Sequence, residues 1–210
     1  MNPTLTKAAA NLKRRAHRRL NLLRMLPSLW LMSDETRLPD PALVLASLPR
    51  GAALILRHYG AADREALARR LAGLCRQRGI ALVVAGDWRL AAKVGAAGVH
   101  LPEHLARAGL PPGGRLWLRD TRRLLTMAAH GAAGLRRAQS LKASAVLLAP
   151  TFATASHPGR EALGATRSAG MIRKVRVPVL ALGGITPATI NALRNSGCAG
   201  VAGIGFALTI

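Results

Sequence analysis

Aromatic side chains are scarce in this sequence: its 210 residues include three Trp, two Phe and one Tyr. The core must therefore be filled by Leu, Val, Ile and Ala, which favours helices packed on buried aliphatic strands over an aromatic-rich sandwich. The scarcity also speaks against a surface for single-stranded nucleic acid, because such surfaces stack bases on aromatic rings. Hydrophobic residues nevertheless make up 50% of the chain, which excludes a disordered protein and suits a single domain.

Acidic residues are few as well, with 9 Asp and Glu against 31 Lys and Arg and a formal net charge of +22. A field of this sign attracts polyanions, phosphate esters and anionic membranes. A coding bias toward Arg and Ala would produce the same excess without any function, so both interpretations stay open.

Cysteine is limited to Cys75 and Cys198, which lie too far apart to form a metal or redox motif. Cys75 falls on the apolar side of a helical pattern and is expected to be a buried free thiol. No uninterrupted apolar run is long enough to span a membrane, and the N-terminus is too charged for a secretory signal. We therefore expect a cytoplasmic protein.

Residues 1–26 form a compositional zone of their own, with seven Lys or Arg and no acid. Leu12, Leu20, Leu23 and Leu26 can share one helical side, so the segment is predicted to be a basic amphipathic helix preceding a domain over 27–210. The favoured interpretation is that the leucine side packs on the domain. The alternative is that the helix lies on nucleic acid or an anionic membrane.

The rest of the chain alternates short aliphatic runs with helical patterns. Runs of this kind are typical of parallel strands covered on both faces. Eight are predicted, over 29–33, 53–57, 81–85, 98–101, 125–129, 145–149, 179–182 and 200–204. Helices are predicted over 63–78 with Gly79 as its end, over 132–142, and from Thr186 and Pro187 to Gly197.

Eight strands separated by helices predict a single (β/α)8 barrel. A doubly wound sheet would normally carry a glycine-rich turn after its first strand, where this chain has Ser33-Asp34-Glu35. Because the sequence ends at Ile210, the last helix is expected to be missing or truncated. We expect the helix of residues 1–26 to cover part of the gap.

Glycines follow the last two predicted strands, at Gly183-Gly184 and on either side of Ile204, at Gly203 and Gly205. Such barrels commonly hold phosphate after these strands, where glycine lets backbone N–H groups approach closely and a helix N-terminus adds a favourable dipole. The two clusters predict a phosphate-binding site.

Polar groups follow other strands at the same end of the barrel. His130 ends the fifth strand and is a candidate acid or base, because imidazole exchanges protons near neutrality. Arg57 follows the second strand and could neutralise an anion. His100 is expected to pack inside the barrel.

Several segments resemble thiamine-phosphate synthase and its thiazole tautomerase relative, in the right order and over about residues 29–208. They are Leu29-Trp30-Leu31-Met32-Ser33-Asp34, the run from Val94 to Leu101, the run from Ala149 to Thr154, the run from Val179 to Ile185, and Gly200-Val201-Ala202.

The resemblance implies that the thiazole-phosphate side of the site is kept. The positions that it assigns there are Thr154, Ala155, Ser156, Gly184, Ile204 and Gly205. Together with Gly183 and His157 they form the predicted substrate- and phosphate-binding set. The resemblance also implies losses. The Gln-x-Arg-x-Lys of the synthases becomes Ile55, Arg57 and Tyr59, so only the arginine is kept. The lysine after the sixth strand becomes His157, and the serine before His130 becomes Ala128.

The resemblance places the two metal-binding aspartates of the synthases at Gly86 and at or near Leu105. Mg²⁺ is therefore expected only with synthase-like chemistry, with Asp87 and Glu103 as the substitutes to consider. The tautomerase branch also lacks these aspartates, has the same residues as this chain at Gly86 and at Leu101-Pro102, and uses the histidine that matches His130. The residues of this chain therefore match the tautomerase branch better than the synthases, and no metal ligand is predicted.

Three functions follow. The first is an enzyme of thiamine assembly that acts on a thiazole phosphate or similar phosphate ester, with His130 and Arg57 in catalysis. The second is a non-catalytic protein that binds the same phosphorylated small molecule. The third, not favoured, is a nucleic-acid- or membrane-associated protein acting through residues 1–26. The sequence leaves open whether copies form a homo-oligomer.

Overall fold

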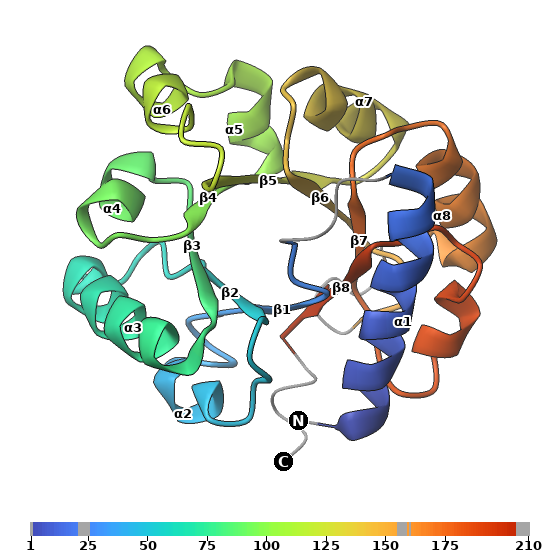
Figure 1. Cartoon of the computed structure of the whole chain (residues 1–210), viewed down its shortest axis with the longest axis horizontal. Coiled ribbons are helices and arrows are strands. Elements are labelled where there is room, and N and C mark those ends of the chain that lie inside the picture. The colour runs from blue at the N-terminus through green and yellow to red at the C-terminus, as the bar shows by residue number, and fades with distance from the viewer. Residues whose placement is uncertain (1, 21–25, 155–158, 160, 205–210) are drawn as a thin grey trace.

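Eight parallel strands close into a barrel in the computed structural model, which describes residues 2–20, 26–154, 159 and 161–204 (Figure 1). The strands are β1 (Leu29–Met32), β2 (Ala53–Leu56), β3 (Ala81–Ala85), β4 (Gly98–Leu101), β5 (Leu124–Ala129), β6 (Ala145–Leu148), β7 (Val179–Leu182) and β8 (Gly200–Gly203). Each pairs with its neighbours in chain order, and β8 pairs with β1. The predicted (β/α)8 barrel is confirmed, with every strand end within one residue of its expected place.

Helices surround the barrel because the outer faces of these aliphatic strands also need cover. They are α2 (Ala42–Leu45), α3 (Arg64–Arg78), α4 (Trp88–Lys93), α5 (Glu103–Ala108), α6 (Pro112–Trp117), α7 (Ala132–Ser140), α8 (Gly164–Arg173) and the 3₁₀ helix η1 (Ile190–Leu193). The longest of these, α3, ends as predicted at Gly79, whose φ of 64° closes the helix in the left-handed region. Cys75 is buried on its inner side as a free thiol.

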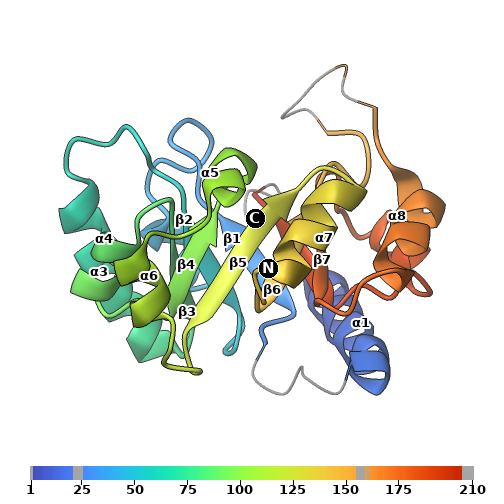
Figure 2. The same ribbon diagram turned by 90° about the horizontal axis from the view of Figure 1, so that it is seen from above.

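The first helix, α1 (Pro3–Leu20), lies on the outside of the barrel where its last and first strands meet (Figures 1 and 2). It contacts β8, β1 and η1. Its inward side is apolar and buried, and consists of Leu5, Ala9, Leu12, Ala16 and Leu20. The apolar side of the basic helix is thus used in packing on the barrel, and the basic side faces outward. Leu26 is buried too, while Leu23 lies outside the described residues.

Polar contacts also attach α1 to its surroundings. The Arg19 guanidinium donates hydrogen bonds to the carbonyls of Ile172 and Val175 at the end of α8, both at 3.1 Å. Arg15 donates to the Asn195 side chain at 3.0 Å. Cations suit the C-terminal carbonyls of a helix, so the basic residues of α1 contribute to the fold as well as to the surface charge. The division of the chain at residue 26 stays a prediction.

The helix predicted from Thr186 to Gly197 is wrong. The segment forms a turn followed by the four residues of η1. The N–H groups of Thr186 and Thr189 each donate to the other's hydroxyl, at 2.9 and 3.2 Å, in the reciprocal pattern that begins helices, but only the four residues of the 3₁₀ helix η1 follow. The helix dipole expected beside the phosphate is therefore not available from Pro187.

The expected truncation of the eighth helix concerns residues after Ile204, which lie outside the described residues and leave it a prediction. None of the helices in the described part of the chain is long and apolar enough to cross a membrane.

Replacing Leu12 by Ala should lower the free energy of unfolding by about 2–4 kcal/mol, because its buried side chain fills the contact between α1 and the barrel. Urea unfolding followed by circular dichroism measures the change. Lys7→Ala, at an exposed position on the same helix, should stay within about 0.5 kcal/mol of the wild type. Equal stability of Leu12→Ala and wild type would contradict the packing of α1.

Candidate functional site

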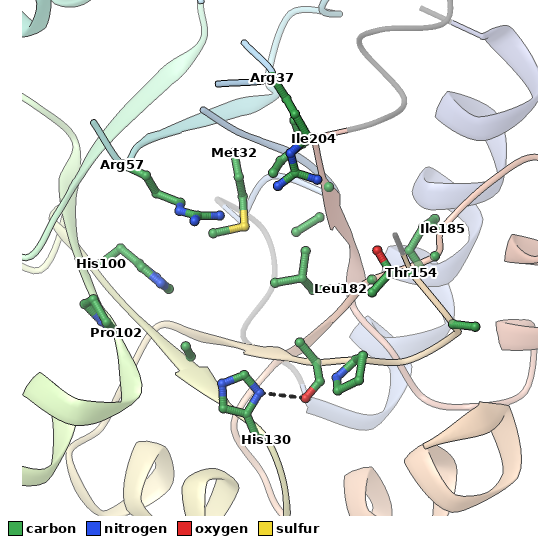
Figure 3. A pocket seen from close by; sticks show the side chains of 18 of the residues that line it. Met32, Arg37, Arg57, His100, Pro102, His130, Thr154, Leu182, Ile185 and Ile204 are labelled. Atoms are coloured by element: carbon green, nitrogen blue, oxygen red, sulfur yellow. Dashed lines mark hydrogen bonds between the residues drawn. The ribbon is translucent and has the colours of Figure 1, made fainter. Parts of the chain in front are cut away.

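A cavity of about 720 Å³ opens at the C-terminal ends of the strands, the end where barrels of this type place their sites (Figure 3). Its lining includes apolar side chains from four strands or strand ends, which are Met32, Ala128, Leu182 and Ala202. Polar and charged groups reach it from the loops that follow the strands. This division gives an apolar floor with a polar rim.

One side of the cavity is made of backbone and small side chains after β6, β7 and β8. Gly183, Gly184, Ile204 and Thr154 all line the cavity here, and Figure 3 labels Thr154 and Ile204. Gly184 has a φ of 63°, and a Cβ atom at this position would lie 2.3 Å from the carbonyl oxygen of Ala153. The close passage of two loops therefore requires glycine and leaves peptide groups at the cavity wall.

The other residues predicted for phosphate binding are not placed by the structure. Ala155, Ser156, His157 and Gly205 lie outside the described residues.

Two arginines reach the cavity from the loops after β1 and β2. Arg57 follows β2 as expected, and Arg37 comes from the loop after β1; their guanidinium groups lie on either side of Met32 (Figure 3). Both are near the Asp34 carboxylate, with Nη2–Oδ2 distances of 2.9 Å for Arg37 and 3.9 Å for Arg57. The hydrogen bond from the Arg37 side chain, with backbone N–H donors and the Arg37 charge, holds the pKa of Asp34 well below its usual range.

Arg37 was missed by the sequence reasoning. The available signal was the spacing Asp34-x-x-Arg37, in which the Asp34 side chain also accepts hydrogen bonds from the N–H groups of Thr36 and Arg37 at 3.2 and 3.0 Å. Such a turn fixes an arginine beside its own aspartate. The pattern is too common to mark a site by itself.

A buried hydrogen-bond network holds Arg57 in place. The Ser33 hydroxyl accepts a hydrogen bond from the Arg57 N–H at 2.8 Å and lies 2.9 Å from Nδ1 of the buried His58. His58 Nε2 is 3.0 Å from the Pro39 carbonyl, which can only accept, so Nε2 carries the proton and Ser33 donates to Nδ1. The ends of β1 and β2 are thereby locked together.

His100 lies inside the barrel, as expected, and forms part of the cavity lining. Its Nδ1 is 3.0 Å from the Thr126 hydroxyl. Burial, aided by the positive charge of Arg57, lowers the pKa of His100 to about 3, so the ring is neutral near pH 7. A neutral imidazole here can orient a ligand by hydrogen bonding but adds no positive charge.

His130 stands at the rim directly after β5. Its Nδ1 is 2.8 Å from the carbonyl oxygen of Ala149, so the Nδ1 proton is donated to that carbonyl (Figure 3). Nε2 is then the nitrogen that can take up and release a proton, and it lies 3.6 Å from Oε2 of Glu103. In this tautomer Nε2 lies at the cavity rim as a hydrogen-bond acceptor.

The positions that the resemblance assigns to the metal-binding aspartates come together in space but are apolar. A Cβ atom at Gly86 would lie 3.3 Å from the Tyr59 ring and 3.5 Å from the Leu105 side chain. The nearby Asp87 carboxylate accepts the Leu90 N–H at 2.9 Å as the N-cap of α4.

Within the described part of the chain, no three His, Cys, Asp or Glu side chains gather as metal ligands. Mg²⁺ prefers hard oxygen ligands, and the positions Gly86 and Leu105 supply no side-chain oxygen for it.

The chain matches the family model described as "Thiamine monophosphate synthase" over residues 32–206. It is 30% identical over 206 residues to thiamine-phosphate synthase of Bordetella avium, covering 87% of this chain and 88% of that protein. It is 36% identical over 148 residues to thiamine-phosphate synthase of Parasynechococcus marenigrum, covering 68% of this chain and 40% of that protein. Thus the alignment spans about two fifths of the second relative.

A thiamine phosphate pyrophosphorylase from Pyrococcus furiosus has a similar solved structure. The TM-score is 0.69 at 20% sequence identity, and the alignment covers 86% of each chain. At this identity the likeness supports the barrel fold.

Replacing Gly184 by Ala should lower the free energy of unfolding by about 1–3 kcal/mol, because the new methyl group meets the Ala153 carbonyl in a backbone conformation that alanine disfavours. Thermal and urea unfolding measure the change in stability. The affinity for inorganic phosphate, measured by titration, tests whether the cavity wall still binds it. Gly170→Ala is the matched control, because a Cβ atom there meets nothing within 4 Å inside α8. It should raise the stability by about 0.5–1 kcal/mol, and a similar gain in Gly184→Ala would refute the close passage of the loops.

Proposed function

Because the chain belongs to the thiamine monophosphate synthase family, we propose that its cavity binds a thiazole phosphate or a similar phosphate ester, and that His130 moves a proton on the bound ring. The observation that carries this proposal is the hydrogen bond from His130 Nδ1 to the Ala149 carbonyl, which leaves Nε2 as the proton-exchanging nitrogen at the cavity rim. Tautomerisation in thiamine metabolism is the reaction that fits these residues.

The phosphate group would lie on the glycine side, against the peptide groups of Gly183, Gly184 and Ile204. Peptide N–H groups bind phosphate without adding bulk or a titrating charge. Arg37 and Arg57, which line the same cavity, supply the positive potential that favours an anionic ligand. We propose that Thr154 and the neighbouring Ala155, Ser156, His157 and Gly205 complete this side.

His130 would act as a base and then as an acid. Nε2 takes a proton from one ring atom of the ligand, and the resulting imidazolium returns a proton to another ring atom. Because no bond to phosphorus or diphosphate is broken, the net charge of the ligand is the same before and after. The step therefore needs a positioned imidazole and a phosphate anchor, and both are supported by the geometry.

A second candidate, a non-catalytic phosphate-ligand-binding protein, is favoured by the apolar contact of Gly86, Leu105 and Tyr59. This contact lies where the synthases of the resembling family need carboxylates for Mg²⁺. A protein with this loss could still keep the phosphate side intact. Ligand-induced thermal stabilisation without turnover would support this candidate.

His130→Gln should reduce kcat for a thiazole phosphate tautomer by about 100-fold or more while its dissociation constant changes little, because glutamine cannot transfer the proton. Turnover is followed by NMR of the substrate, and binding by calorimetry. His17→Gln, at an exposed position on α1, is the control and should match the wild type.

The same assay with a pyrimidine diphosphate and a thiazole phosphate, with and without Mg²⁺, tests the synthase alternative. Mg²⁺-dependent coupling of the two would overturn the assignment to tautomerase-like chemistry. Full activity of His130→Gln on the tautomer would overturn the role of His130.

A further inference from the structure

We propose that Glu103 is a positioning residue that stabilises the imidazolium which His130 forms between the two proton transfers; this inference rests on the proposed function. The carboxylate of Glu103 faces His130 Nε2 at 3.6 Å. Among the described residues that line the cavity, Glu103 is the one acid. It therefore differs in charge from the arginines and histidines around it.

The fold brings the two residues together from neighbouring strands. β4 and β5 pair in parallel, with Leu101 opposite Met127, so the segments that follow both strands emerge side by side. Glu103 is the first residue of α5, directly after Pro102, and His130 directly follows β5. Helix α5 also packs against β5 and α7. Both backbones are thus fixed by regular structure, which positions a site more accurately than free loops do.

The two nitrogens of His130 have different partners, and this determines what Glu103 can do. Nδ1 keeps its proton because the Ala149 carbonyl can only accept a hydrogen bond. In the neutral ring, Nε2 carries no proton, so no hydrogen bond joins it to the Glu103 carboxylate. Once Nε2 is protonated, the imidazolium has a negative charge beside it, which favours the charged ring.

The pair is partly open to solvent, with 35% of the His130 side chain and 22% of the Glu103 side chain exposed. Solvent screens such a pair and keeps its strength moderate. Other charged or titratable groups of the same lining are Arg37, Arg57, Tyr59, His100 and His104, and α7 carries Arg136 and Arg137. The Glu103 carboxylate is thus the one negative charge among the described residues of this lining, set against its arginines.

In the proposed reaction, Glu103 does not take the proton itself. The proton moves from the ligand ring to Nε2 and back to another ring atom, while the carboxylate stays ionised and interacts with the imidazolium between the two transfers. We therefore expect Glu103 to affect kcat through His130 and to leave the binding of the ligand nearly unchanged.

Glu103→Gln keeps the size of the side chain and removes its charge. We expect kcat to fall about fivefold with KM within about twofold of the wild type. We also expect a smaller imidazolium fraction of His130 at fixed pH, read from its ¹⁵N chemical shifts without substrate. Glu103→Asp, which keeps the charge, should recover part of both. Glu65→Gln, which removes an exposed carboxylate on α3, should change neither.

An unchanged His130 spectrum in Glu103→Gln overturns the inference whatever the activity, and so does an equal loss in Glu65→Gln. The spectrum needs no substrate, so it separates this inference from the proposed function. If the wild type binds and turns over no thiazole phosphate but the spectrum changes as expected, the Glu103–His130 pair is supported and the proposed function fails.

Discussion

The pairing of β8 with β1 is the contact on which the rest of the molecule depends. It places Leu29 opposite Val201 and Leu31 opposite Gly203, and so closes the sheet. A Cβ atom at Gly200 would lie 2.3 Å from the Ser28 carbonyl oxygen, so this join requires glycine where β8 begins. Closure brings the loop after β1, with Arg37, beside the end of β8, with Ile204. The two sides of the cavity exist as one site because of this pairing.

Helix α1 covers the join from outside. In a regular βα barrel, the helix after each strand covers the sheet next to it, and the position beside β8 and β1 is filled here by a helix that precedes β1 in the chain. The N-terminal segment can pack on the barrel in spite of its basic composition, because its apolar residues fall on one side of α1. Arg19, on the outer part of the helix, adds hydrogen bonds to the end of α8. A surface for a polyanion would have to use the outward basic side alone.

The strands could be predicted because each is a short aliphatic run buried on both faces, a pattern that depends little on distant residues. Gly79 ended α3 as predicted for an equally local reason. The helix from Thr186 failed in its length and type: the two threonines make the reciprocal bonds that begin a helix, but only four residues of 3₁₀ helix follow, and a start signal does not predict how far a helix continues. Arg37 and the partner of His130 could not be found from spacing, since their roles arise from the closure of the barrel and the adjacency of β4 and β5.

The charges around the cavity bear differently on the two reactions of the family, loss of a diphosphate and tautomerisation. Departure of diphosphate builds up negative charge, and hard cations or several free positive groups must neutralise it. Here Asp34 lies against both Arg37 and Arg57 and cancels part of their charge, while Leu105 and Tyr59 cover Gly86. In the proposed reaction, a proton that leaves a bound ring and returns to it would create no lasting charge on the ligand, and the transient charge on His130 would lie near Glu103. The electrostatics of this cavity therefore suit proton transfer on a phosphate-anchored ligand better than loss of a diphosphate.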